Sequence, residues 1–130
     1  MTIGKAMNIA SSGMHAERFR MDVISGNIAN ANAINGPGKP EIRRQSVMLT
    51  GGENGVRIAG IAKDQSALRR KYQPGNPAAD ADGFVSYTNI NPVFEMVDMI
   101  GASRAYEANL AAFNSAKTMM NAALTIGRTA

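Results

Sequence analysis

The sequence predicts a mainly α-helical protein, in which two long terminal helices form an antiparallel coiled coil and a short middle segment holds a β-hairpin and extended chain. Apolar residues at both ends of the chain recur in alternating steps of three and four, which is the heptad pattern of a coiled coil. Between these ends, glycine, proline and short β-like runs replace that pattern. The predicted organisation is 1–33 for the first helix, 34–90 for the middle and 91–130 for the second helix.

The first helix is predicted by a heptad series that only Glu17 breaks: Ile3, Met7, Ala10, Met14, Glu17, Met21, Ile24, Ile28, Ala31. At about 1.5 Å per residue, a helix of this extent is roughly 45 Å long. It ends in a stretch rich in asparagine, "NIANANAIN". Asparagine disfavours helix interiors because its side chain competes for backbone hydrogen bonds. So many asparagines at a helix end therefore require an explanation.

The second helix is predicted to begin at Pro92, with Asn91 as its N-cap, and to stop at Gly127. Its heptad series is weakened by one serine and one lysine: Met96, Met99, Ser103, Tyr106, Leu110, Phe113, Lys117, Met120, Leu124. A second apolar stripe on its first turns comprises Val93, Val97 and Ile100.

The middle segment, residues 36–90, holds eight of the thirteen glycines and four of the five prolines. The runs at 43–49 and 55–62 are joined by "TGGENG", which predicts a β-hairpin. A further strand-like run covers 83–88. The stretch from Tyr72 to Gly83 is rich in Pro, Gly and Asp and predicts a long ordered loop or an extended arm.

The composition points to no enzyme, cofactor or metal site. The chain has no cysteine and a single histidine, His15, which excludes thiolate catalysis and leaves a histidine–metal site without obvious partners. No secretory signal peptide and no apolar run long enough to span a membrane is apparent. We therefore expect a cytoplasmic protein, or one exported by a route that cleaves no signal.

The net charge of +4 arises mainly in the middle segment. Its cations outnumber its nearby acids: Lys39, Arg43, Arg44, Arg57, Lys63, Arg69, Arg70 and Lys71 against Glu41, Glu53 and Asp64. A basic stretch can bind nucleic acid, so a small basic coiled-coil adaptor for nucleic acid is an alternative function. Because few aromatic residues accompany these cations, a solvated or subunit-facing surface is favoured, and no nucleic acid is expected as a partner.

A narrow heptad stripe needs a partner surface along its whole length, and a lone hairpin of two helices buries little apolar area. We therefore hypothesise that the terminal helices are loose in the monomer and become ordered on assembly.

Two blocks of the sequence resemble a known family. "SSGMHAERFRMDVISGNIANANA" is similar to the segment shared by the flagellar axial proteins. "YQPGNPAADADGFV", followed by "NINPVFEMVDMIGASRAYEANLAAFNSAKTMMNAALTIG", resembles the proximal-rod subunits of the bacterial flagellar basal body, although another rod protein of the same family is an alternative. The resemblance covers nearly the whole chain and is weakest in the compact middle.

The resemblance implies a structural subunit that assembles helically with copies of itself and with other rod and basal-body axial proteins, and transmits torque across the periplasm. It implies export by the flagellar type III apparatus without signal cleavage, and no membrane insertion. It also implies that a set of residues on the two helices forms the subunit interface: Met14, Met21, Ile24, Asn27, Ile28, Asn30, Asn32, Met96, Met99, Arg104, Tyr106, Glu107, Asn109, Leu110, Phe113, Met120 and Leu124.

Overall fold

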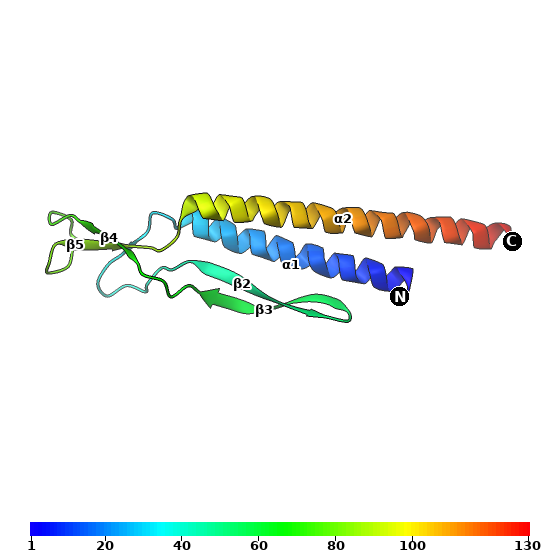
Figure 1. Cartoon of the computed structure of the whole chain (residues 1–130), viewed down its shortest axis with the longest axis horizontal. Helices are drawn as coiled ribbons and strands as arrows, with labels where there is room; N and C mark the ends of the chain where they lie inside the picture. Colours follow the sequence, from blue (N-terminus) through cyan, green and yellow to red (C-terminus); the bar gives the residue numbers. More distant parts are fainter.

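Two antiparallel helices give the chain its elongated shape, and two small β-sheets accompany them (Figure 1). The computed structural model describes residues 1–130. Its helices are α1 (Ile3–Ala29) and α2 (Pro92–Thr129), and its strands are β1 (Ile34–Asn35), β2 (Gln45–Gly52), β3 (Gly55–Lys63), β4 (Arg69–Tyr72) and β5 (Phe84–Tyr87). The prediction of two terminal helices with β-structure between them is confirmed at this level.

Helix α1 begins after Thr2, whose side chain accepts a hydrogen bond of 3.1 Å from the backbone N–H of Lys5. It ends at Ala29, two residues before the predicted end of the heptad series. There Asn30 closes the helix, because its side-chain Nδ2 donates to the carbonyl oxygen of Gly26 at 3.0 Å. One asparagine of the "NIANANAIN" stretch therefore serves the helix end, as its local propensity suggests.

Helix α2 begins as predicted, since the side chain of Asn91 accepts from the backbone N–H of Val93 at 3.0 Å and Pro92 occupies the first helical position. The predicted stop at Gly127 is wrong, because the helix continues to Thr129. A glycine ends a helix by adopting a positive φ, and Gly127 is not among the glycines that do so.

The two helices differ in length, with 27 residues in α1 and 38 in α2. At a rise of about 1.5 Å per residue, α2 is roughly 16 Å longer than α1. Figure 1 shows its C-terminal end extending past the N-terminus of α1. Residues 121–130 are all exposed, and we call this part of α2 the overhang.

Strands β2 and β3 form the predicted hairpin, paired antiparallel from Gln45↔Lys63 to Gly52↔Gly55. The hairpin lies along α1, largely on the side away from α2 (Figure 1). Its turn approaches α1 closely, because the hydroxyl of Ser12 accepts from the backbone N–H of Val56 at 3.0 Å. Gly55 has a φ of 109°, and a Cβ there would lie 2.2 Å from the Ser12 hydroxyl oxygen, so both its backbone and its surroundings require glycine.

The second sheet has the order β1-β5-β4, all antiparallel, and lies beyond the end of the helix pair (Figure 1). Strand β5 matches the predicted run at 83–88, and the Pro/Gly/Asp stretch forms the loop between β4 and β5. Strands β1 and β4 were not predicted. The four residues of β4 are all exposed, so they lack the alternation of burial that reveals a strand in sequence.

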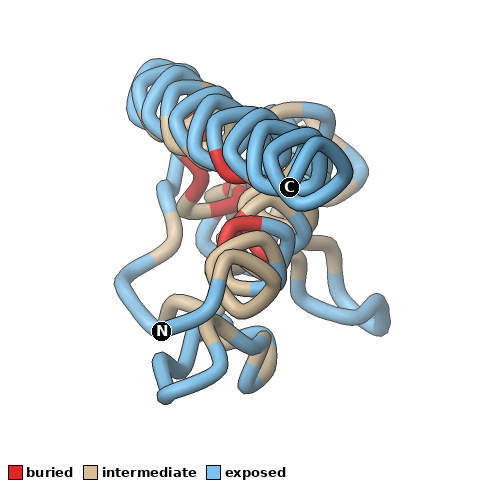
Figure 2. The backbone as a smooth tube through the Cα atoms, turned by 90° about the vertical axis from the view of Figure 1, so that its right-hand side faces the viewer, coloured by how far each residue is buried: buried red, intermediate tan, exposed pale blue.

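Buried positions lie along the facing sides of the two helices (Figure 2), and small residues are common among them. Val85, Thr88 and Ile90, in and after β5, are buried as well. Ala10 and Gly13 of α1, and Ala102 and Ala116 of α2, are buried. Gly13 is required by its surroundings, since a Cβ there would lie 2.5 Å from the side-chain oxygen of Asn109 on α2. Small residues let two helices approach closely.

The buried or half-buried side of α2 follows heptad steps along Glu95, Met99, Ala102, Tyr106, Asn109, Phe113, Ala116 and Met120, which we call the seam. The predicted series agrees at every second position and lies one residue off at the others. Met96 and Leu110, predicted within it, are instead 53% and 39% exposed. In place of Ser103 and Lys117, the seam contains the neighbouring Ala102 and Ala116. It also contains the buried Glu95.

Candidate functional site

Five side chains from three distant segments meet at a buried polar cluster, which we call the polar node. It comprises Asn27 of α1, Arg44 just before β2, Asn89 just before α2, and Glu95 and Asp98 in the first turns of α2. Glu95 is 0% exposed and Asn27 4%. Charged groups are almost never fully buried unless they are paired, so this cluster marks a site at which the sequence has arranged specific partners.

Asn27 connects all three segments. Its amide nitrogen Nδ2 donates to the carbonyl oxygen of Gln45 at 2.8 Å and to Oε2 of Glu95 at 2.9 Å. Its side-chain oxygen accepts from the backbone N–H of Gln45 at 3.0 Å. The Asn27 side chain therefore pairs with both backbone groups of Gln45, as a neighbouring β-strand would, and donates one hydrogen bond to the buried carboxylate of Glu95. This role answers the question that the asparagine-rich stretch raised for Asn27.

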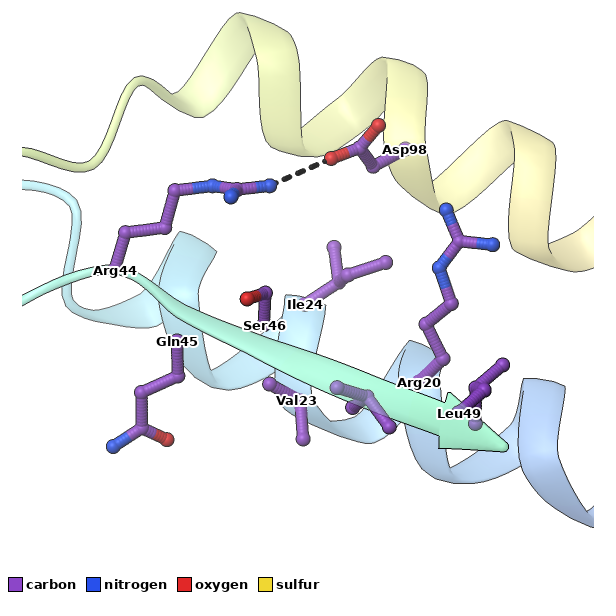
Figure 3. Close-up of a pocket in the computed structure, with 9 residues that line it drawn as sticks. Arg20, Val23, Ile24, Arg44, Gln45, Ser46, Leu49 and Asp98 are labelled. Atoms are coloured by element: carbon purple, nitrogen blue, oxygen red, sulfur yellow. Dashed lines mark hydrogen bonds and ion pairs between the residues drawn. The ribbon is translucent and has the colours of Figure 1, made fainter. Parts of the chain in front are cut away.

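Arg44 neutralises the node. Its Nε donates to Oε1 of Glu95 and its second guanidinium nitrogen to Oδ2 of Asp98 at 2.8 Å. The hydrogen bond that Arg44 donates to Glu95 raises the pKa of Arg44 above its ordinary value, burial opposes this, and the negative charges of Glu95 and Asp98 raise it further. Figure 3 shows the Arg44 side chain reaching from the start of β2 toward Asp98 on α2.

Asn89 anchors the backbone of Arg44. Its side-chain oxygen accepts from the N–H of Arg44 at 2.8 Å, and its nitrogen donates to the carbonyl oxygen of Asp64 at 3.1 Å. Asn35 makes a similar clamp in the preceding loop, accepting from the N–H of Ile42 at 2.7 Å and donating to its carbonyl oxygen at 3.1 Å. Asparagine side chains therefore fix the path of the middle segment along the helix pair.

The node does not resemble a catalytic centre. Its acids are already bound by Arg44 and Asn27, and no nucleophile with a neighbouring base lies among the residues that line the adjacent pocket: Arg20, Val23, Ile24, Arg44, Gln45, Ser46, Val47, Leu49 and Asp98 (Figure 3). No group of three or more His, Cys, Asp or Glu residues in the chain could hold a metal ion. No helix combines the length and apolar character needed to cross a bilayer.

Many cations of the middle segment are engaged within the chain, which weakens the case for a nucleic-acid surface. Arg43 donates to Glu41 at 2.6 Å and Arg70 to Asp80 at 2.5 Å. Arg69 donates to the carbonyl oxygens of Thr88 at 3.1 Å and Ala31 at 2.9 Å. Together with Arg44, these side chains stabilise the fold rather than forming a free basic stripe.

The loop between β4 and β5 is organised by Asp80. Its carboxylate accepts from the backbone N–H groups of Phe84 at 2.9 Å and Asp82 at 3.0 Å. The hydrogen bond from the Phe84 amide, followed by the bond and charge of Arg70, lowers the pKa of Asp80 below its ordinary value. The stretch "DADG" at 80–83 therefore forms a turn that the Asp80 side chain caps.

A group of large apolar side chains on the first turns of α2 contacts no other part of the chain extensively. Val93, Phe94, Met96, Val97 and Ile100 are between 53% and 67% exposed, and we call them the apolar patch. The overhang and the turn before it add Met119, Leu124 and Ile126 at 60–70% exposure. Contiguous exposed apolar surface of this kind marks protein–protein contact.

The predicted interface residues divide into three groups by burial. Ile24 and Asn27 are buried inside the chain. Eight are half-buried: Met14, Met21, Ile28, Met99, Tyr106, Asn109, Phe113 and Met120. Seven are exposed: Asn30, Asn32, Met96, Arg104, Glu107, Leu110 and Leu124. Only the exposed group is fully available to another subunit in this conformation.

Sequence reasoning missed Arg44, Asn89 and Glu95 as the partners of Asn27. Arg44 was interpreted as part of a basic stretch on a solvated or subunit-facing surface. Glu95 lies one residue before Met96, which was an expected heptad position. A heptad series shifted by one residue would have placed Glu95 on the packed side of the helix.

The elongated helix pair, its internally paired polar node and the exposed apolar surface of α2 are features of a protein that assembles with others. Comparison with known proteins specifies the class further. The family model described as flagella basal body rod protein matches residues 7–37, and the model described as flagellar basal body rod FlgEFG protein C-terminal matches residues 81–126.

Curated relatives match almost the whole chain. The flagellar basal-body rod protein FlgC of Borreliella burgdorferi is 41% identical, with 97% of this chain and 98% of the relative covered. Those of Bacillus subtilis and Salmonella typhimurium are 35% and 37% identical, with 98% of this chain and 100% of each relative covered. The chain belongs to the FlgC family of flagellar basal-body rod proteins.

Proposed function

We propose that this chain is a structural subunit of the proximal rod of the bacterial flagellar basal body. The observation that carries the proposal is the identity of 35–41% to FlgC proteins over nearly the full length of both partners. The same identity supports a location in the basal body. A role in catalysis is not proposed, because the buried acids of the node are occupied by structural partners.

In the assembled rod, we propose that the units 1–33 and 91–130 pack against neighbouring axial proteins as coiled-coil helices, with 34–90 on their outer side. The exposed predicted residues on both helices, such as Asn30, Arg104 and Leu124, would face these neighbours. The apolar patch supports this arrangement, since water-exposed apolar side chains gain stability when a neighbour covers them. Torque would pass along helices that the polar node holds in a fixed relation to the middle segment.

We further propose that the chain travels through the flagellar type III export apparatus and that its terminal helices become fully ordered only on assembly. The small-residue core supports this step, because alanine and glycine contacts bury little apolar area per residue. Hydrogen exchange tests whether the terminal helices become ordered on assembly. The α2 amides beyond Met120 should exchange rapidly in the dilute chain and slowly in purified basal bodies. Slow exchange in the dilute chain would contradict the proposal.

The direct test is a high-resolution electron-microscopy map of purified basal bodies. We expect density for two long antiparallel helices at the inner wall of the rod, with residues 36–90 outside. Absence of this chain from the rod would refute the proposed function.

A substitution tests the exposed asparagine. Asn30→Leu should impair rod assembly and motility without abolishing export, because it removes a polar group that we place at a subunit contact. Asn8→Leu, at another exposed asparagine on α1 outside the predicted interface, is the matched control. Normal rods with Asn30→Leu would remove this residue from the interface.

A further inference from the structure

Two Asn-Gly dipeptides occur in the chain, at 35–36 and at 54–55. The side-chain amide carbon of an asparagine lies within reach of the backbone nitrogen of the next residue, and attack by that nitrogen closes a succinimide ring. Glycine has no Cβ and leaves the nitrogen open to approach. The fold decides which of the two asparagines is free to react, because it holds their side chains differently.

The fold protects Asn35. Its side-chain oxygen accepts from the backbone N–H of Ile42 at 2.7 Å, and its nitrogen donates to the carbonyl oxygen of the same residue at 3.1 Å. Both Asn35 and Gly36 are half-buried. The amide must break both hydrogen bonds before its carbon turns toward the nitrogen of Gly36, so this dipeptide is held away from the reaction.

The fold leaves Asn54 unrestrained. This residue is exposed and lies in the turn of the β2–β3 hairpin (Figure 1), between the last paired residues Gly52 and Gly55. Its side-chain amide makes no hydrogen bond, whereas the neighbouring Glu53 accepts from Lys5 at 3.4 Å. The hollow at this turn has no apolar residue in its lining, so water reaches the amide; it is lined by Gly52, Glu53, Asn54, Gly55 and Arg57.

The glycine that follows Asn54 is required by the fold. Gly55 has a φ of 109°, and a Cβ at this position would collide with the hydroxyl of Ser12 on α1. The contact that seats the hairpin on α1 therefore keeps a residue without a side chain next to an unrestrained asparagine. The reactive dipeptide follows from the way the hairpin packs.

We propose that Asn54–Gly55 is a site of spontaneous deamidation. The backbone nitrogen of Gly55 loses its proton and bonds to Cγ of Asn54, the Cγ–Nδ2 bond breaks, and Nδ2 leaves as ammonia. Water then opens the succinimide: attack at Cγ gives aspartate, and attack at the backbone carbonyl carbon gives isoaspartate. One amide and one water become one carboxylate and one ammonia, and nothing is oxidised or reduced.

The two products differ in their effect on the hairpin. Aspartate leaves the backbone unchanged and adds a negative charge beside the pair of Lys5 and Glu53. Isoaspartate routes the backbone through the side chain and lengthens the turn by one carbon. Gly55 has no spare room beside Ser12, so the longer turn displaces the hydrogen bond of 3.0 Å from the N–H of Val56 to the Ser12 hydroxyl. Isoaspartate therefore loosens the hairpin from α1.

The test follows the purified full chain during incubation at mildly alkaline pH, where the attacking nitrogen loses its proton more readily. Peptide mass spectrometry measures the conversion of each asparagine, and a protein-isoaspartate methyltransferase with a labelled methyl donor detects isoaspartate. We expect Asn54 to convert, and Asn35 to convert about tenfold more slowly because two hydrogen bonds must first break. Equal rates at the two residues would overturn the inference.

The same incubation in urea is the matched control. Urea removes the hydrogen bonds between Asn35 and Ile42, so the two dipeptides should then convert at similar rates. A difference that persists in urea would assign the selectivity to the flanking sequence and overturn the structural argument. An Asn54 amide that stays intact in the folded chain, while it converts in urea, would show that the turn protects it and would also overturn the inference.

A variant tests the effect on the hairpin. Asn54→Asp reproduces the aspartate product without the additional backbone carbon, so amide exchange at Val56 should match that of the unmodified chain. In the isoaspartate form, separated by chromatography, the same amide should exchange faster by up to about tenfold, the change expected for one lost hydrogen bond. Unchanged exchange at Val56 in the isoaspartate form would overturn the coupling between the turn and α1.

Discussion

Replacing Asn27 by alanine tests the central part of the structure, because this side chain connects α1, β2 and α2 through three hydrogen bonds. The substitution leaves the carbonyl and N–H groups of Gln45 without their partners at 2.8 and 3.0 Å and removes the 2.9 Å donor from the buried carboxylate of Glu95. An unsatisfied buried polar group costs about 1–3 kcal/mol. Gln45 is only half-buried and regains some hydration. The expected loss in the free energy of unfolding is about 2–4 kcal/mol.

The control is Asn30→Ala, three residues later in the same stretch. Asn30 is exposed and its side chain makes one hydrogen bond, to the carbonyl oxygen of Gly26. Surface substitutions of this kind change stability by about 0.5 kcal/mol or less. Urea unfolding followed by circular dichroism gives the difference between the two variants, and amide hydrogen exchange at Gln45 reports the local opening.

A third variant separates shape from charge. Asn27→Asp keeps the size of the side chain and an acceptor for the N–H of Gln45, but it places a carboxylate beside that of Glu95. Like charges at this distance repel, so Asn27→Asp should be less stable than Asn27→Ala. Equal stability of Asn27→Ala and Asn30→Ala, with unchanged exchange at Gln45, would refute the connecting role of Asn27.

Three further predictions concern the fit of the elements and the loop. Gly13→Val should lower the free energy of unfolding by about 1–3 kcal/mol, because the larger side chain overpacks the contact with α2. Gly4→Ala, with nothing within 4 Å of its Cβ, should instead raise the free energy of unfolding by about 0.4–1 kcal/mol, and urea unfolding measures both changes. Gly55→Ala should speed amide exchange in the β2–β3 hairpin by lifting its turn from Ser12, and unchanged exchange would contradict the close contact. The pKa of Asp80 is lowered in the folded chain. The contribution of its carboxylate to stability is therefore present above the ordinary pKa and is lost as pH falls through the lower folded value. At such acidic pH, amide exchange across residues 80–84 should accelerate, whereas at neutral pH it should not.

The sequence predicted those elements whose signals are local. The N-cap Asn91 and Pro92 placed the start of α2 correctly, and the glycine-rich turn at 50–55 identified the hairpin. Strand β4 carries three consecutive cations, and nothing in its composition shows that β5 pairs with it. Its existence depends on tertiary contacts that a short window of sequence does not contain.

The site was predicted only in part for the same reason. Asparagine propensity pointed to the end of α1 and was correct for Asn30, but Asn27 acts on partners 18 and 68 residues away. Hydrophobic periodicity favoured Met96 over Glu95 for the inside position. In the structure Glu95 is buried and Met96 is exposed, because Arg44, 51 residues earlier in the chain, neutralises the glutamate. An argument from periodicity considers each side chain without its partners and so does not predict this.

The separations within the polar node set the order in which the chain can close. Because a chain is synthesised from its N-terminus, α1 and the β2–β3 hairpin are complete before α2, and Asn27 can already bind Gln45. The node remains open until Glu95 has been made, because that residue lies 68 positions after Asn27. The node is the first connection that α2 can make to α1, because residues that pack further along the pair, such as Asn109 against Gly13, follow Glu95 in the chain. The helix pair can therefore begin to form only after the whole middle segment has been made, because Asn27 and Glu95 lie on either side of that segment.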